Sequence, residues 1–196
     1  MKKVLIATAL GMLVAGQVAA QESPWLVRAR VVNMQMTNDN TTPVTGLGVS
    51  NKTIPEVDIS YFFTSNIAAE LILTVPQQMK LVAGTSNVGT FDALPPTLTL
   101  QYHFTNFTGF KPYVGAGLNY TIISNVNIAP YGLDKHSYGF AAQAGVDVPL
   151  TKQVSLNFDI KKVQLQSDVY VAATGAKAGT LKLDPLLVGI GVGYRF

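Results

Sequence analysis

The sequence has no cysteine among its 196 residues, which excludes disulfide bonds and thiolate metal sites. Charge is also scarce, because only 13% of the residues are charged whereas 48% are hydrophobic. The formal net charge is +3, and two of these charges belong to Lys2 and Lys3 at the start of the chain. The rest of the sequence therefore has no basic patch that would indicate nucleic acid as a partner. After residue 20, no apolar run reaches the roughly 18 residues of a membrane-spanning helix. Apolar residues are thus abundant but interleaved, which is typical of a transmembrane β-barrel.

The first twenty residues have the three-part layout of a secretory signal peptide. A basic start at Lys2 and Lys3 precedes an apolar stretch over residues 4–14, and small residues lead to Ala20. An uncleaved anchor is the alternative, but the stretch is short and a polar, β-patterned sequence follows it. We therefore expect a signal peptide over residues 1–20, cleaved after Ala20, and a single domain over residues 21–196.

Eight later segments alternate apolar with small or polar residues, and a period of two indicates β-strands. The last is the clearest, since its apolar face continues to Tyr194 and Phe196 at the end of the chain. In the seventh, the apolar positions change phase at Lys161 and Lys162, which predicts a bulge. The predicted strands cover residues 25–34, 56–64, 67–75, 97–105, 111–122, 136–150, 154–166 and 186–196.

Short turns alternate with long loops over residues 35–55, 76–95, 123–135 and 167–184. This pattern predicts an antiparallel barrel with short turns on its periplasmic rim and long loops outside the cell. A soluble barrel that turns its apolar face inward has the same alternation. The polar face, however, is rich in Gly, Thr and Ser but poor in Lys and Glu, which is unlike a solvated surface. We therefore predict an all-β fold, an eight-stranded antiparallel transmembrane β-barrel.

Charged side chains occupy many inward positions of the predicted strands. A barrel of eight strands is only wide enough for side chains to fill its interior, so that a general porin is not expected. Both signs of charge are present, and we expect pairing that closes the tube in preference to an ion path. The inward glycines either open a cavity or, as we favour, let a small barrel curve tightly. The predicted charge network comprises Arg28, Arg30, Asp58, Glu70, His103, Asp147, Asp159, Lys161 and Arg195.

The loop over residues 76–95 is apolar and is flanked by prolines, which cannot donate to a strand ladder. Our hypothesis is that a small hydrophobic ligand enters among the apolar residues and leaves sideways into the bilayer at the proline seam. The alternative is that the prolines only end the strands. The proposed ligand-entering residues are Met79, Leu81, Val82, Phe91 and Leu94, and the proposed seam residues are Pro76, Pro95 and Pro96.

Nothing in the sequence indicates an enzyme, a cofactor or a metal site. Asp134, His136 and Ser137 lie close together, but no Gly-x-Ser-x-Gly nucleophile turn accompanies them. The Asn- and Thr-rich first loop, over residues 37–45, supports a second hypothesis. Under that hypothesis the protein is a surface barrel that acts as a receptor or in envelope stress adaptation and transports nothing.

Several segments in order along the chain resemble the outer membrane protein W (OmpW) family. They cover residues 94–104, 111–120, 143–147, 156–159, 184–186 and 191–196, whereas Lys162 stands where that family usually has an aromatic residue. The resemblance implies an eight-stranded outer-membrane barrel of a Gram-negative bacterium that passes small hydrophobic molecules.

The resemblance also implies partners. These are outer-membrane lipid and lipopolysaccharide, small hydrophobic ligands, and a colicin or phage for some family members. Tyr194 and the terminal Phe196 resemble the signal that the outer-membrane assembly machinery reads.

Overall fold

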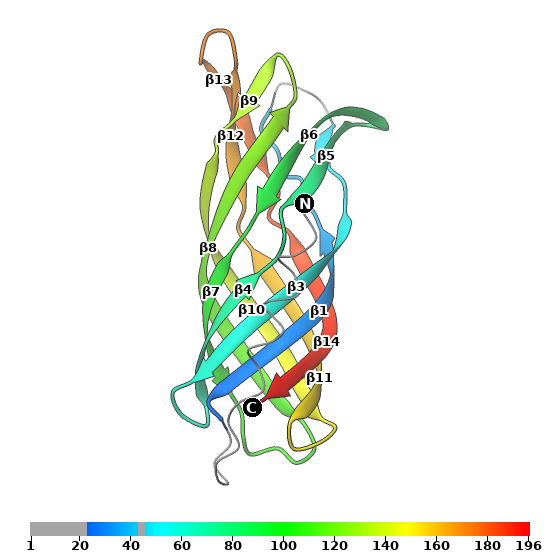
Figure 1. Ribbon diagram of the computed structural model, residues 1–196. Helices are drawn as coiled ribbons and strands as arrows, with labels where there is room; N and C mark the ends of the chain where they lie inside the picture. The colour runs from blue at the N-terminus through cyan, green and yellow to red at the C-terminus, as the bar shows by residue number, and fades with distance from the viewer. Residues whose placement is uncertain (1–22, 43–45) are drawn as a thin grey trace, which may run out of the picture.

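The computed structural model describes residues 23–42 and 46–196. The predicted signal peptide, residues 1–20, lies outside the described residues. Eight long strands form a closed antiparallel barrel, in which each strand pairs with the next and β14 pairs with β1 (Figure 1). The strands are β1 (Trp25–Gln35), β3 (Lys52–Phe62), β4 (Ile67–Leu73), β7 (Thr97–His103), β8 (Lys111–Asn127), β10 (His136–Pro149), β11 (Val154–Val163) and β14 (Leu186–Arg195). All eight predicted strands and the barrel fold are confirmed. No helix in the described part of the chain is long and apolar enough to cross a membrane.

The apolar face of the barrel points outward. Leu98, Leu118 and Phe140 are 57%, 62% and 69% exposed, whereas the residues next to them on the other face of each strand are mostly buried. Aromatic pairs gather at the end of the barrel that carries the short turns, where Trp25 lies 4.8 Å from Tyr61 between ring centroids. The soluble-barrel alternative is therefore rejected, since it requires the apolar face inside.

The predicted long loops contain six further strands at the end opposite the C-terminus, where they extend the barrel wall (Figure 1). The hairpin of β5 (Gln77–Ala83) and β6 (Ser86–Leu94) joins the barrel through β8, and β2 (Leu47–Val49) pairs with β5. β9 (Tyr131–Leu133), β12 (Gln166–Val171) and β13 (Lys177–Lys182) form a separate sheet. The described parts of the predicted loops thus contain strands that lengthen the barrel wall, whereas loops without strands were expected from the sequence.

The predicted bulge in β11 is wrong. Its register with β14 runs without a shift through Lys161 and Lys162, and alternate residues stay buried up to Leu165. The apolar positions of the sequence change phase because the interior of the barrel changes from polar to apolar along this strand. From Lys161 toward the short turns, the inward positions of β11 are polar. In the other direction, Val163 and Leu165 pack into an apolar cluster.

Close backbone approach explains two inward glycines. A Cβ atom added at Gly191 would lie 2.1 Å from the carbonyl oxygen of Ala29, and one at Gly117 would lie 1.9 Å from that of Leu98. No side chain fits at such distances, so these glycines allow neighbouring strands to coil closely in a narrow barrel. This geometry supports curvature and not cavity formation at these two positions.

Candidate functional site

Two arginines of β1 lie at the centre of a buried ion-pair network. The Arg28 guanidinium donates from Nε and Nη2 to the two carboxylate oxygens of Asp147 at 3.1 and 2.7 Å. Its Nη1 donates to Asp58 at 3.1 Å. Arg30 donates from Nη2 to Glu70 Oε1 at 2.8 Å and also pairs with Asp58. These side chains cross the barrel from four different strands and fill its interior.

Arg30 links this group to a second one on β3 and β11. Its Nη1 lies 3.2 Å from Glu56 Oε1 and 3.3 Å from Asp159 Oδ1. Lys161 Nζ lies 3.1 Å from both oxygens of Glu56. We call the whole group the charged plug; its members are Arg28, Arg30, Glu56, Asp58, Glu70, Asp147, Asp159 and Lys161, all at most 6% exposed. Its three cations and five carboxylates give a formal charge of −2.

Neutral side chains complete the hydrogen bonds of the charged plug. Tyr113 donates to Asp159 at 2.9 Å, Asn157 donates to Asp147 at 2.9 Å, and Gln143 donates to Glu70 at 2.6 Å. Sequence reasoning had not selected these three residues or Glu56. Each lies in the inward phase of a predicted strand, which is the signal that could have identified it.

Two residues of the predicted network lie on the turn side of the charged plug. The His103 ring lies between Phe62 and Tyr113; it is tilted against Phe62 at 4.7 Å and stacked on Tyr113 at 5.0 Å between centroids. Arg195 lies over the Phe62 ring at 4.1 Å, and its Nε donates to the Ser23 carbonyl at 2.9 Å. The structure therefore brings seven of the nine predicted residues into the charged plug, with His103 next to it and Arg195 near the barrel rim.

On the loop side of the charged plug, the interior is apolar. Met79, Leu81 and Phe91 are at most 3% exposed and belong to one hydrophobic cluster with residues of β1, β11 and β14. Val82 and Leu94 are only partly buried and lie outside that cluster's buried set. A cavity of about 200 Å³, the loop-side cavity, is lined by Thr42, Leu47, Leu81, Val88, Ile128, Ala129, Tyr131 and Val169.

The strand ladder is interrupted at the proline seam. Ile72 pairs with Thr97 and Gln77 pairs with Ala93, and residues 73–76 and 94–96 between these pairs make no ladder contact with one another. Leu94, the last residue of β6, pairs with β8 instead, so β6 continues the line of β7 along β8. The prolines therefore lie at a real break in the wall.

A second break adjoins the first. The β3–β4 ladder ends at the pair of Val57 and Leu73, which leaves residues 52–56 of β3 without a ladder partner on that side. Single hydrogen bonds cross the break there, from Thr74 to the Pro55 carbonyl and from Lys52 to the Gln78 carbonyl. A cavity of about 30 Å³, the seam cavity, lies beside it. Its lining includes Leu73, Thr74 and Pro95 in the wall and Met34, Ile54 and Leu187 inside.

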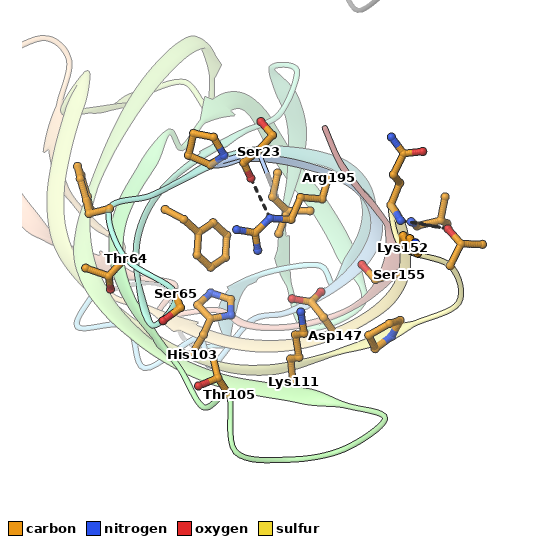
Figure 2. A pocket seen from close by; sticks show the side chains of 18 residues that line it. Ser23, Thr64, Ser65, His103, Thr105, Lys111, Asp147, Lys152, Ser155 and Arg195 are labelled. Atoms are coloured by element: carbon orange, nitrogen blue, oxygen red, sulfur yellow. Dashed lines mark hydrogen bonds between the residues drawn. The ribbon is translucent and has the colours of Figure 1, made fainter. Parts of the chain in front are cut away.

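A third cavity, the turn-side cavity, has a volume of about 590 Å³ and lies on the other side of the charged plug. Figure 2 shows Arg195, His103, Asp147 and Lys111 turned toward the space that it occupies inside the ring of strands. Other lining residues belong to the short turns, among them Ser65, Thr105 and Gln153. The charged plug thus lies between two internal spaces of different character, one apolar and one lined by both charged and apolar side chains.

Among the described residues of the outer rim, Asp134, His136 and Ser137 are not hydrogen-bonded to one another as a catalytic triad requires. His136 Nδ1 lies 2.8 Å from the Tyr120 hydroxyl, and Ser137 is buried with its hydroxyl accepting from the Gln166 amide. Among the described residues, no group of three or more His, Asp or Glu side chains could hold a metal ion. In the extracellular sheet, hydrogen bonds from Lys177 and Thr180 lower the pKa of Asp168 below its usual value.

The fold and its interior define the class of protein. Each of the eight barrel strands is hydrogen-bonded to a neighbour on both sides, so that the strands form a closed ring. The outer face of this ring is apolar, and the charged plug lies inside it. Such a barrel is an integral outer-membrane β-barrel, surrounded by membrane lipid. The chain belongs to the OmpW family, whose model matches residues 14–196. It is therefore a protein of the Gram-negative outer membrane.

Three relatives support this assignment. An uncharacterized outer-membrane protein, y4mB, of Sinorhizobium fredii is 44% identical over 191 residues, which cover 91% of this chain and 82% of that protein. Outer membrane protein W of Escherichia coli is 30% identical over 212 residues, which cover both chains completely. The dibenzothiophene metabolism operon protein PahQ of Pseudomonas aeruginosa is 28% identical over 193 residues, which cover 90% of each chain.

The fold is also that of a solved structure. The crystal structure of the outer membrane protein OprG from Pseudomonas aeruginosa matches with a TM-score of 0.75. The match covers 92% of this chain and 99% of that chain at 22% sequence identity, and it shows a shared fold.

Proposed function

We propose that the protein is a passive path for small hydrophobic molecules, which enter from outside and leave sideways into the outer membrane. The observation that carries this proposal is the apolar interior above the charged plug, with a cavity of about 200 Å³ among the extracellular strands. An apolar molecule gains free energy at about 25 cal/mol for each Å² that it removes from water there. The charged plug offers it no such gain.

The interrupted seam gives such a molecule a way out. Straight passage would require it to separate buried ion pairs, which costs several kcal/mol. Between residues 73–76 and 94–96, by contrast, no ladder hydrogen bonds have to break. The seam cavity supports this exit, because interior residues of the apolar cluster such as Met34 and Ile54 line it together with Leu73 and Pro95 in the wall. The name of the P. aeruginosa relative also supports an apolar ligand, since dibenzothiophene is a fused aromatic molecule.

A crosslink across the seam tests the exit. Because the chain contains no cysteine, Thr74→Cys with Pro95→Cys introduces a single thiol pair at the lining of the seam cavity. The pair is closed by a disulfide or by a short thiol-reactive linker that itself contains a reducible disulfide. Uptake of a small fluorescent aromatic compound into bacteria that lack other copies of the protein should fall on closure and recover on reduction.

The matched control crosslinks the same two strands where they are already paired, at Ala69→Cys and Leu100→Cys. This control should leave uptake unchanged. Unchanged uptake with the seam crosslinked would refute the sideways exit. Equal uptake with and without the protein would refute transport itself and, with lost colicin or phage sensitivity, would support the receptor hypothesis.

Filling the loop-side cavity tests the entrance separately. Val88 is 43% exposed and lines this cavity, so Val88→Trp should lower uptake without disturbing the barrel strands. Thr174→Trp, in the exposed turn between β12 and β13, is the control and should have no effect. Full uptake by the Val88 variant would contradict the proposed entrance.

A further inference from the structure

The turn-side cavity has no role in the proposed path, because the charged plug separates it from the apolar interior. Its volume of about 590 Å³ falls within the range of small-molecule sites, about 300 to 1,000 Å³. Residues of three short turns line it, together with Ser23 and Arg195 near the two ends of the described chain. It is therefore reached from the periplasm.

The lining of this cavity carries an excess of positive charge. Lys111, Lys152 and Arg195 contribute three cations, whereas Asp147 is the sole carboxylate among the described lining residues. Arg28 holds both oxygens of Asp147 at 3.1 and 2.7 Å, and the charged plug to which both belong carries a formal charge of −2. The three lining cations exceed that charge by one, and a cavity with an excess of one sign of charge between low-dielectric walls concentrates ions of the opposite sign. Its chemistry favours an anion.

Lys111 is the cation best placed to bind such an anion. It begins β8, lies opposite Asp147 in the β8–β10 ladder and is only partly exposed. Among the residues that the structure describes, none forms a hydrogen bond or an ion pair with its ammonium group. Figure 2 shows the Lys111 side chain directed into the ring beside Asp147.

Other parts of the wall are apolar. Leu26, Phe62 and Val154 line the cavity, and the Phe62 ring meets the His103 ring at 4.7 Å between centroids with a tilt of 53°. Arg195 lies over the Phe62 ring at 4.1 Å, and its Nε donates to the Ser23 carbonyl. Apolar side chains of this kind favour the ring of a ligand because they remove its surface from water.

We propose that the turn-side cavity binds small aromatic carboxylates from the periplasm. The carboxylate accepts hydrogen bonds from Lys111, and the ring of the ligand lies against Leu26, Phe62 and Val154. Binding is non-covalent and reversible. A neutral compound of the same shape loses the ion pair, and a small anion without a ring loses the apolar contact, so both bind more weakly.

The test is a titration of ¹⁵N-labelled protein, purified from outer membranes, with benzoate, benzyl alcohol and acetate, followed by NMR. Benzoate should shift the amides of Ser65, Thr105 and Ser155 in a saturable manner. Lys111→Met should weaken benzoate binding about tenfold, as the loss of one charge-assisted hydrogen bond predicts. Lys80→Met is the control, because Lys80 is an exposed lysine on β5 at the other end of the molecule.

Binding by Lys80→Met should equal that of the unchanged protein. Benzyl alcohol or acetate binding at the same amides as tightly as benzoate would overturn the proposal, as would saturable shifts confined to the extracellular strands. Unaltered benzoate affinity in a folded Lys111→Met variant would overturn the role of Lys111. The spectrum of each variant without ligand shows whether its barrel is folded, so a lost fold is not mistaken for lost binding.

Discussion

Replacing Arg30 by Met should be among the most destabilising single changes in the barrel. The Arg30 guanidinium pairs with Glu56, Asp58, Glu70 and Asp159, and its side chain has no exposed surface. Methionine fills a similar volume but leaves these carboxylates with two cations, Arg28 and Lys161, in place of three. Buried negative charges that lose a partner are costly because the barrel interior cannot solvate them.

The expected cost is about 3 to 5 kcal/mol in the free energy of unfolding, the usual loss when one partner of a buried ion pair is removed. Glu70→Gln should cost only about 1.5 kcal/mol or less, because it lowers the excess of negative charge and the amide oxygen still accepts from Arg30. The formal charge of the plug therefore predicts an asymmetry, in which loss of a cation costs more than loss of a carboxylate.

Urea unfolding of the barrel in lipid vesicles measures these free energies. Arg30→Lys is the matched control, since it keeps the charge but cannot bridge all four carboxylates, and it should fall between the other two variants. Equal losses for Arg30→Met and Glu70→Gln, or a loss below about 1 kcal/mol for Arg30→Met, would refute the reasoning. Either result would mean that water or counter-ions reach the plug and screen it.

Two further predictions concern β14. Gly191→Ala should lower the yield of folded barrel, because its Cβ would lie 2.1 Å from the Ala29 carbonyl oxygen. Gly189→Ala should be tolerated, because its nearest contact is the Val32 side chain at 3.1 Å and its other contacts lie at 3.6 Å or more. Gel mobility of unheated samples measures the folded fraction, and equal yields would contradict the close-approach argument. The amide of Phe196 donates a long hydrogen bond of 3.3 Å to the Trp25 carbonyl. Deletion of Phe196 should nevertheless reduce the amount of folded protein at the cell surface more than the loss of its few contacts would suggest. Phe196→Tyr keeps the terminal aromatic and should restore assembly, whereas normal surface levels of the truncated protein would count against an assembly signal.

Much of the candidate site could be read from strand periodicity. Once the phase of β1 is known, Arg28 and Arg30 must face inward, and the same holds for Asp58 and Glu70 in their strands. Periodicity does not say which inward residues meet, because that depends on the stagger between strands. Arg195 was therefore grouped with charges that it does not join, since it lies near the rim over Phe62. Glu56, by contrast, shares the inward phase of Asp58 and could have been identified from periodicity.

The phase change in β11 marks where reading of the sequence failed. Val163 and Leu165 looked like a shifted outer face, because a polar lumen was assumed along the whole strand. In the structure the same strand face is polar at Lys161 and apolar above it. A local pattern cannot distinguish a slipped register from an interior that changes polarity with depth.

The sequence by itself determined the strands, their outward face and the membrane barrel, because these follow from a period of two and from the chemistry of each side chain. Tertiary structure alone decided the division of the interior into an apolar upper space, a charged plug and a turn-side cavity. It also decided how far the break in the wall extends beyond the proline seam that the sequence indicated, to residues 52–56 of β3. These features depend on barrel closure and strand stagger, which bring together residues such as Arg28 and Asp147 that are 119 positions apart in the chain.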